Sequence, residues 1–158
     1  MIWLSLLLSL FAQAEMKHEH GVGELYIGVA GKKLAAILTI PADCIIGFEY
    51  EPKSTKDIEI QKQKTLDLES SVHKILKLDE SLKCQLEKAN SLIKREHNHG
   101  EYALTASLVC EKEIQGTKLK INFKDYYSKI KKINLNLVTD KKSQAISFAK
   151  GQGEIVIP

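Results

Sequence analysis

The sequence predicts an α+β fold, a mostly antiparallel β-sheet with one long helix inserted after the first hairpin. Apolar and polar residues alternate along several short stretches, which is typical of half-buried strands. Residues 54–76 instead repeat their apolar side chains at helical spacing. With 158 residues and a hydrophobic content of 44%, the chain is long and apolar enough for one domain with a buried core.

Residues 1–14 have the pattern of a secretory signal peptide. An apolar run at residues 2–11 is too short to span a bilayer, and Ala12-Gln13-Ala14 is a small-x-small cleavage site. The segment departs from the usual pattern because no Lys or Arg precedes the run, and an uncleaved membrane anchor is the alternative. We expect an exported, soluble mature protein in which residues 15–158 form a single domain and are not embedded in a membrane.

The first predicted hairpin follows directly. Residues 24–29 alternate as a strand, residues 34–40 form a more uniformly apolar strand, and Gly31-Lys32 makes the turn. Pro41 ends the second strand because proline has no N–H to donate to a ladder. Residues 41–52 combine turn residues with buried-type side chains, which predicts a compact irregular segment.

The long helix begins after Pro52. Ser54, with Asp57 three residues later, is a capping signal. One apolar stripe has the spacing i, i+4, i+7, i+8, and consists of Leu68, Val72, Ile75 and Leu76. His73 lies off this stripe, so we expect it to be an exposed helix residue without a role.

Two further strands are predicted on either side of residues 96–100. Cys84 lies on the apolar face of the first strand, and Cys110 ends the apolar face of the second, residues 102–110. If these strands pair antiparallel, both cysteines come within disulfide reach. Three cysteines allow three pairings, and we favour Cys84–Cys110. Cys44 is then left over as a buried thiol, a zinc-binding thiolate or one half of an intermolecular disulfide.

The remaining strands are shorter. Residues 119–123 and 133–137 alternate clearly, and residues 146–149 and 155–157 form two closing strands. Residues 125–130 are compatible with a short helical turn.

Four of the five histidines form two H-x-H pairs, His18 with His20 and His97 with His99. In an extended segment residues i and i+2 project to the same side, so each pair can aim two imidazoles at one point. Four imidazole nitrogens are enough to close a tetrahedral zinc site. The alternative is that these polar, glycine-flanked histidines are simply solvated loop residues.

Several acids lie close to these histidines in the sequence. Glu19, Glu96 and Glu101 could each bind the same ion or orient an imidazole ring, or be solvated surface acids. Glu49 in the irregular segment is a weaker candidate, with acceptance of loop N–H groups as its alternative role.

Other classes of function have less support. The formal net charge is +3 with charges interspersed, and aromatic content is 6%, which does not favour nucleic-acid binding. The sequence has neither an H-E-x-x-H helix nor a G-x-S-x-G elbow, so we predict no enzyme, and a zinc hydrolase is the least favoured reading.

The order of motifs resembles the ZrgA-like periplasmic zinc-uptake proteins of bacteria. An H-x-H-G segment and a hairpin precede Pro41-Ala42-Asp43, Gly47-Phe48-Glu49 and a helix. Cys84, a histidine-bearing loop, a strand ending at Cys110 and residues 133–139 then follow in the order of that family.

The resemblance implies a soluble periplasmic protein that binds Zn(II) and supports its import, with an inner-membrane ABC-type metal transporter as partner. It carries over His18, His20, His97 and His99 as the candidate ligands. The chain departs from the family pattern in its short histidine loop and in Tyr50, where histidine is frequent. Both departures favour a single ion over a buffer that holds several.

Two alternatives remain open. If cleavage fell after Glu15, the new N-terminus Met16-Lys17-His18 would favour square-planar copper(II) or nickel(II). The chain could also be a metal-free binding module of the cell envelope.

Overall fold

The computed structural model of the chain describes residues 19–158. The predicted signal peptide, the cleavage site and His18 lie outside the described residues. Within residues 19–158, no helix combines the length and the apolar character that crossing a bilayer requires.

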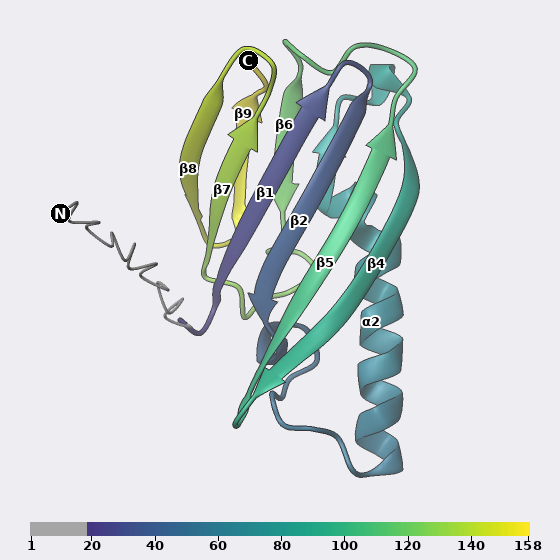
Figure 1. Cartoon of the computed structure of the whole chain (residues 1–158), viewed down its shortest axis with the longest axis vertical. Coiled ribbons are helices and arrows are strands. Elements are labelled where there is room, and N and C mark those ends of the chain that lie inside the picture. The colour runs from purple at the N-terminus through teal and green to yellow at the C-terminus, as the bar shows by residue number, and fades with distance from the viewer. Residues whose placement is uncertain (1–18) are drawn as a thin grey trace, which may run out of the picture.

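The largest element is a six-stranded sheet with the strand order β4-β5-β2-β1-β7-β8 (Figure 1). Its strands are β1 (Val22–Ala30), β2 (Lys33–Pro41), β4 (Gln85–Glu96), β5 (His99–Val109), β7 (Lys132–Val138) and β8 (Ser143–Ala149). All neighbours pair antiparallel except β1 and β7, which are parallel. The predicted α+β class, with its mostly antiparallel strands, is confirmed.

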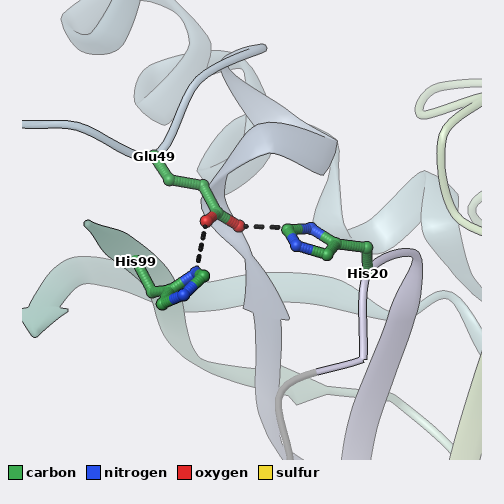
Figure 2. A group of neighbouring side chains, drawn as sticks. All are labelled: His20, Glu49 and His99. Carbon is green, nitrogen blue, oxygen red and sulfur yellow. Dashed lines mark hydrogen bonds and ion pairs between the residues drawn. The ribbon is translucent and has the colours of Figure 1, made fainter. Parts of the chain in front are cut away.

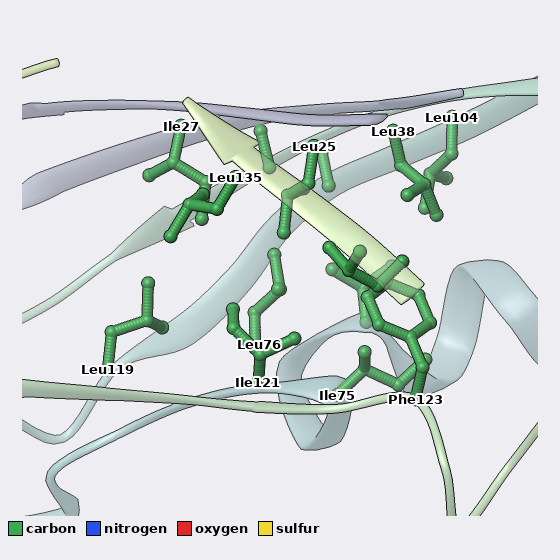
Figure 3. Packing of buried hydrophobic residues seen from close by; sticks show 14 of the residues in the cluster. Leu25, Ile27, Leu38, Ile75, Leu76, Leu104, Leu119, Ile121, Phe123 and Leu135 are labelled. Atoms are coloured by element: carbon green, nitrogen blue, oxygen red, sulfur yellow. The ribbon is translucent and has the colours of Figure 1, made fainter. Parts of the chain in front are cut away.

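A second layer packs against one face of this sheet. It contains the long helix α2 (Thr55–Ile75) and a three-stranded sheet of β3 (Leu76–Leu78), β6 (Lys118–Asn122) and β9 (Gln152–Val156). Figure 3 shows Leu25 and Leu135 of the large sheet facing Ile121 and Phe123 across the core. The core lies between the layers because every second residue of each strand points to that side.

The helix α2 forms largely as the sequence predicts. The Ser54 hydroxyl accepts a hydrogen bond of 3.1 Å from the Asp57 N–H and so caps its first turn. Leu68, Val72 and Ile75 are buried, and His73 is exposed, as expected. Leu76 is also buried, but it begins β3 instead of ending the helix.

The segment after the first hairpin is more regular than predicted. Pro41 is the last residue of β2, and residues Ala42–Ile45 form the short helix α1. The backbone N–H of Ile46 donates to the Ala42 carbonyl at 2.8 Å, which closes a helical turn that the turn-rich composition had concealed.

The strand predicted around Cys84 begins later than expected. Residues Glu80–Leu82 form a 3₁₀ turn, η1, because the Asp79 carboxylate accepts a hydrogen bond from the Ser81 N–H. Lys83 then adopts a left-handed backbone with φ of 50°, and β4 starts at Gln85. Cys84 therefore precedes the strand, although the antiparallel pairing of β4 with β5 still brings it to Cys110.

The structure contains the predicted Cys84–Cys110 disulfide. It joins the start of β4 to the end of β5, where Gln85 is paired with Val109. Cys44 is the free cysteine, and its side chain is buried next to Ile45 in the core.

Candidate metal centre

Three segments meet at one end of the large sheet. Because β1 and β5 both run antiparallel to β2, the start of β1, the end of β2 and the start of β5 lie together. His20 precedes β1, Glu49 lies in the segment that follows β2 and α1, and His99 is the first residue of β5. The topology therefore brings together residues that are far apart in the sequence (Figure 2).

The Glu49 carboxylate lies between the two imidazole rings. Its Oε2 is 2.9 Å from Nδ1 of His99, and its Oε1 is 3.5 Å from Nδ1 of His20. One possible ligand atom from each of His20, Glu49 and His99 lies within 4.8 Å of the other two. Imidazole nitrogen and carboxylate oxygen are both common zinc ligands, so the group has the composition and size of a metal site.

The three side chains differ in exposure. The Glu49 side chain is 13% exposed, whereas those of His20 and His99 are 62% and 57% exposed. The site therefore has a partly buried carboxylate at its base and two accessible imidazoles above it. An ion could enter and leave from the solvent side without opening the fold.

Close packing fixes the backbone of Glu49. Gly100 is buried, and a Cβ added there would lie 2.7 Å from the Glu49 carbonyl oxygen and 3.1 Å from the Ala42 Cβ. Only glycine allows β5 to approach the Glu49 segment this closely. Arg95 on β4 adds a second constraint, because its Nε donates to the same carbonyl at 3.2 Å.

Arg95 also connects this segment to the long helix. Its guanidinium donates to the Gln61 side chain at 2.6 Å and lies 2.9 Å from the Glu51 carboxylate. The Arg95 side chain is 16% exposed, whereas that of Glu51 is 70% exposed, so the guanidinium is largely buried but its ion pair with Glu51 faces water. The position of Glu49 is thus tied to both the sheet and α2.

Two residues of α1 lie beside the group. Asp43 Oδ1 is 3.8 Å from Nδ1 of His20. Burial, with a further contribution from the Asp43 carboxylate, raises the pKa of the Cys44 thiol to about 11. Cys44 is therefore a protonated thiol at neutral pH, and among the described residues it is not a member of the three-residue group.

The structure brings together one histidine from each of the two H-x-H pairs. His20 and His99 belong to the group, whereas His97 is exposed in the β4–β5 turn with φ of 55°. The rule that residues i and i+2 share a side applies to extended backbone, and His97 is not in an extended conformation.

The acids chosen from the sequence lie outside the three-residue group. Glu19 and Glu96 are exposed, and Glu101 is half-buried on β5. The acid that lies beside the histidines is Glu49, and not one of the three acids that are close to them in the sequence. The signal for Glu49 was its position in Gly47-Phe48-Glu49, the compact segment between the hairpin and the helix.

Comparison with known families agrees with this geometry. The model of a family described as "ZrgA family zinc uptake protein" matches residues 17–157. The chain belongs to the ZrgA family. No curated protein matches it. The ZrgA match confirms the resemblance inferred from the motifs, and it covers all three residues of the group.

Proposed function

We propose that this ZrgA protein binds Zn(II) through His20, Glu49 and His99 and supports zinc uptake by carrying the ion outside the bacterial cytoplasm. The observation that carries the proposal is the convergence of three ligand atoms within 4.8 Å in a chain of a zinc uptake family. The ion is cargo, and the proposal gives the protein no catalytic role.

The donor set suits zinc with one further ligand. Zinc in proteins is usually four-coordinate, and two imidazoles with one carboxylate supply three positions. His18 and His97, each two residues from a histidine of the group, are the protein candidates for the fourth position, and water is the alternative. The four histidines singled out in the sequence thus remain within the proposal, with Glu49 added.

The openness of the site fits a carrier. Both imidazoles are more than half exposed, so a partner can reach the ion directly. An inner-membrane ABC-type metal transporter is the partner that we propose for delivery. A zinc site with a purely structural role would differ, because such sites are closed by four protein ligands and leave no open side.

We propose the periplasm as the location. The predicted signal peptide at residues 1–14 supports export, and the Cys84–Cys110 disulfide suits an oxidising compartment. In this proposal residues 15–158 act as one metal-binding domain after cleavage.

Isothermal titration of the metal-stripped mature protein tests the proposal. We expect near-equimolar zinc binding by the wild-type protein. The variants His20→Ala and His99→Ala should each lose more than roughly 100-fold in zinc affinity. Removing a residue that only hydrogen-bonds to a ligand costs up to about that much. His73→Ala, an exposed histidine on α2, is the matched control and should bind as wild type does.

Two results would refute this site. One is wild-type zinc affinity in both His20→Ala and His99→Ala, and the other is an equal loss in His73→Ala. N-terminal sequencing of the exported protein tests the copper or nickel alternative. A chain that starts at Met16 would have His18 as its third residue, which favours those ions over zinc.

A further inference from the structure

Asp43 holds a buried oxygen atom that lacks a hydrogen bond. Among the buried side-chain atoms of residues 19–158, Asp43 Oδ1 is the one without a partner. An unpaired buried acceptor is costly, and such atoms call for a specific explanation in a native structure. Here the explanation lies next to it, because the oxygen is 3.8 Å from Nδ1 of His20.

The backbone fixes this carboxylate more firmly than the histidine beside it. Asp43 is the second residue of α1, and its carbonyl accepts a hydrogen bond of 3.2 Å from the Gly47 N–H. Its neighbours Ala42 and Cys44 are buried in the core. Its side chain is 26% exposed and that of His20 is 62% exposed, so His20 is the partner that can move.

We propose that Asp43 is the positioning residue of the site: its carboxylate accepts a hydrogen bond from Nδ1–H of His20 and so presents Nε2 of that ring to the ion. The inference rests on the proposed function. Histidines that bind metal ions commonly donate their other ring N–H to a carboxylate, which fixes the tautomer and the orientation of the ring. Loading would give the buried Oδ1 the partner that it lacks.

Asp43 suits this role better than Glu49 does. Oε1 of Glu49 lies 3.5 Å from Nδ1 of His20, nearer than Asp43 Oδ1 at 3.8 Å, so the exposed His20 ring must turn its Nε2 toward Glu49 on loading. Glu49 is the ligand in the proposed function, and its Oε2 already lies 2.9 Å from Nδ1 of His99. Asp43 is not a member of the three-residue group, so the inference gives its oxygen the role of orienting His20 and not that of binding the ion. The present 3.8 Å separation exceeds a charge-assisted hydrogen bond by about 1 Å, a shift that one exposed side chain can make.

Nitrogen NMR of the imidazoles in the zinc-loaded wild-type protein tests the orientation directly. We expect His20 to carry its proton on Nδ1 and to bind zinc through Nε2. This measurement needs no substitution at Asp43. Zinc bound through Nδ1 of His20 would overturn the inference.

Substitution supplies the second readout. Asp43→Asn and Asp43→Ala should lower zinc affinity by about 10–100-fold and leave a mixture of His20 tautomers. Asp125→Asn removes an exposed carboxylate elsewhere and is the control for a general loss of negative charge. Loss of charge alone would weaken binding without changing the tautomer, and that result would also overturn the inference.

The same titrations separate this inference from the proposed function. If the wild-type protein does not bind zinc, or binds it independently of His20 and His99, the proposed function fails. If His20→Ala and His99→Ala lose zinc but Asp43→Ala keeps both affinity and tautomer, only the role of Asp43 is refuted.

Discussion

Oε2 of Glu49 lies 2.9 Å from Nδ1 of His99, although 50 residues separate the two in the chain. The other oxygen of this carboxylate faces His20 at 3.5 Å. Glu49 therefore lies within 3.5 Å of both imidazoles, so the three side chains are close together without an ion. A site that is already assembled loses less conformational entropy on binding than one assembled by the ion.

Glu49→Gln should weaken zinc binding strongly, because the amide cannot supply the negative charge that compensates the ion. Glu96→Gln is the matched control, since Glu96 is exposed at the end of β4 and lies outside the group. Competition titration against a chromophoric chelator measures both affinities. Equal losses in the two variants would contradict the assignment of Glu49.

Gly100→Ala should destabilise the fold and weaken zinc binding together. The added methyl group would lie 2.7 Å from the Glu49 carbonyl oxygen, so the segment carrying Glu49 must shift, at a cost of ~1–3 kcal/mol. In Gly28→Ala the new Cβ meets nothing within 4 Å, which makes it the control. Denaturant unfolding and zinc titration of both variants check the prediction; equal behaviour of the two would refute it.

Breaking the Cys84–Cys110 bridge should lower the free energy of unfolding by about 3–4 kcal/mol on the chain-entropy model, given a sequence separation of 26. The measurement compares urea unfolding of the wild-type protein with that of the Cys84→Ser/Cys110→Ser double variant. Mass mapping of unreduced peptides should recover the same bridge. A bridge that contains Cys44 would contradict the pairing of β4 with β5.

The buried Cys44 thiol predicts a pH dependence at the alkaline end. Burial, followed by the charge of Asp43, raises its pKa from 9.0 to about 11 in the folded protein. The folded state then keeps its proton where the unfolded state has lost it, so this contribution to stability is complete below pH 9 and falls as the pH rises through about 11.

The comparison of wild type with Cys44→Ala isolates this effect. Between pH 9 and 11 the free energy of unfolding of the wild-type protein should fall relative to that of the alanine variant. Cys44 in the folded wild-type protein should also resist alkylation at pH 8. Rapid alkylation of the folded protein at that pH would show that the thiol is accessible and ionised.

The sequence was most informative where structure depends on local periodicity. Alternation located β1, β2, β5 and β7, and the capping signal at Ser54 located the start of α2. It was less informative where structure depends on partners. Nothing in the residues of β1 indicates that β7 pairs with it in parallel, because alternation defines a buried face but not a neighbour.

The same distinction applies to the site. The H-x-H pattern pointed to His20 and His99, which the fold brings together with Glu49. It could not show that a two-residue turn would hold His97 away from an extended conformation, since Glu96 pairs directly with His99. Glu49 received less weight because its proximity to His99 depends on the approach of β5 to the segment after α1.

The parallel partnership of β1 with β7 has a consequence for biosynthesis. Gly23 is paired with Ile133, and the Asn134 amide donates to the Glu24 carboxylate at 2.6 Å across a separation of 110 residues. The central strand thus gains its second neighbour only when nearly the whole polypeptide has been made. Contacts so distant in sequence slow folding. Under the export that we propose, a precursor that folds slowly would remain unfolded for longer and so could still pass through a secretion channel.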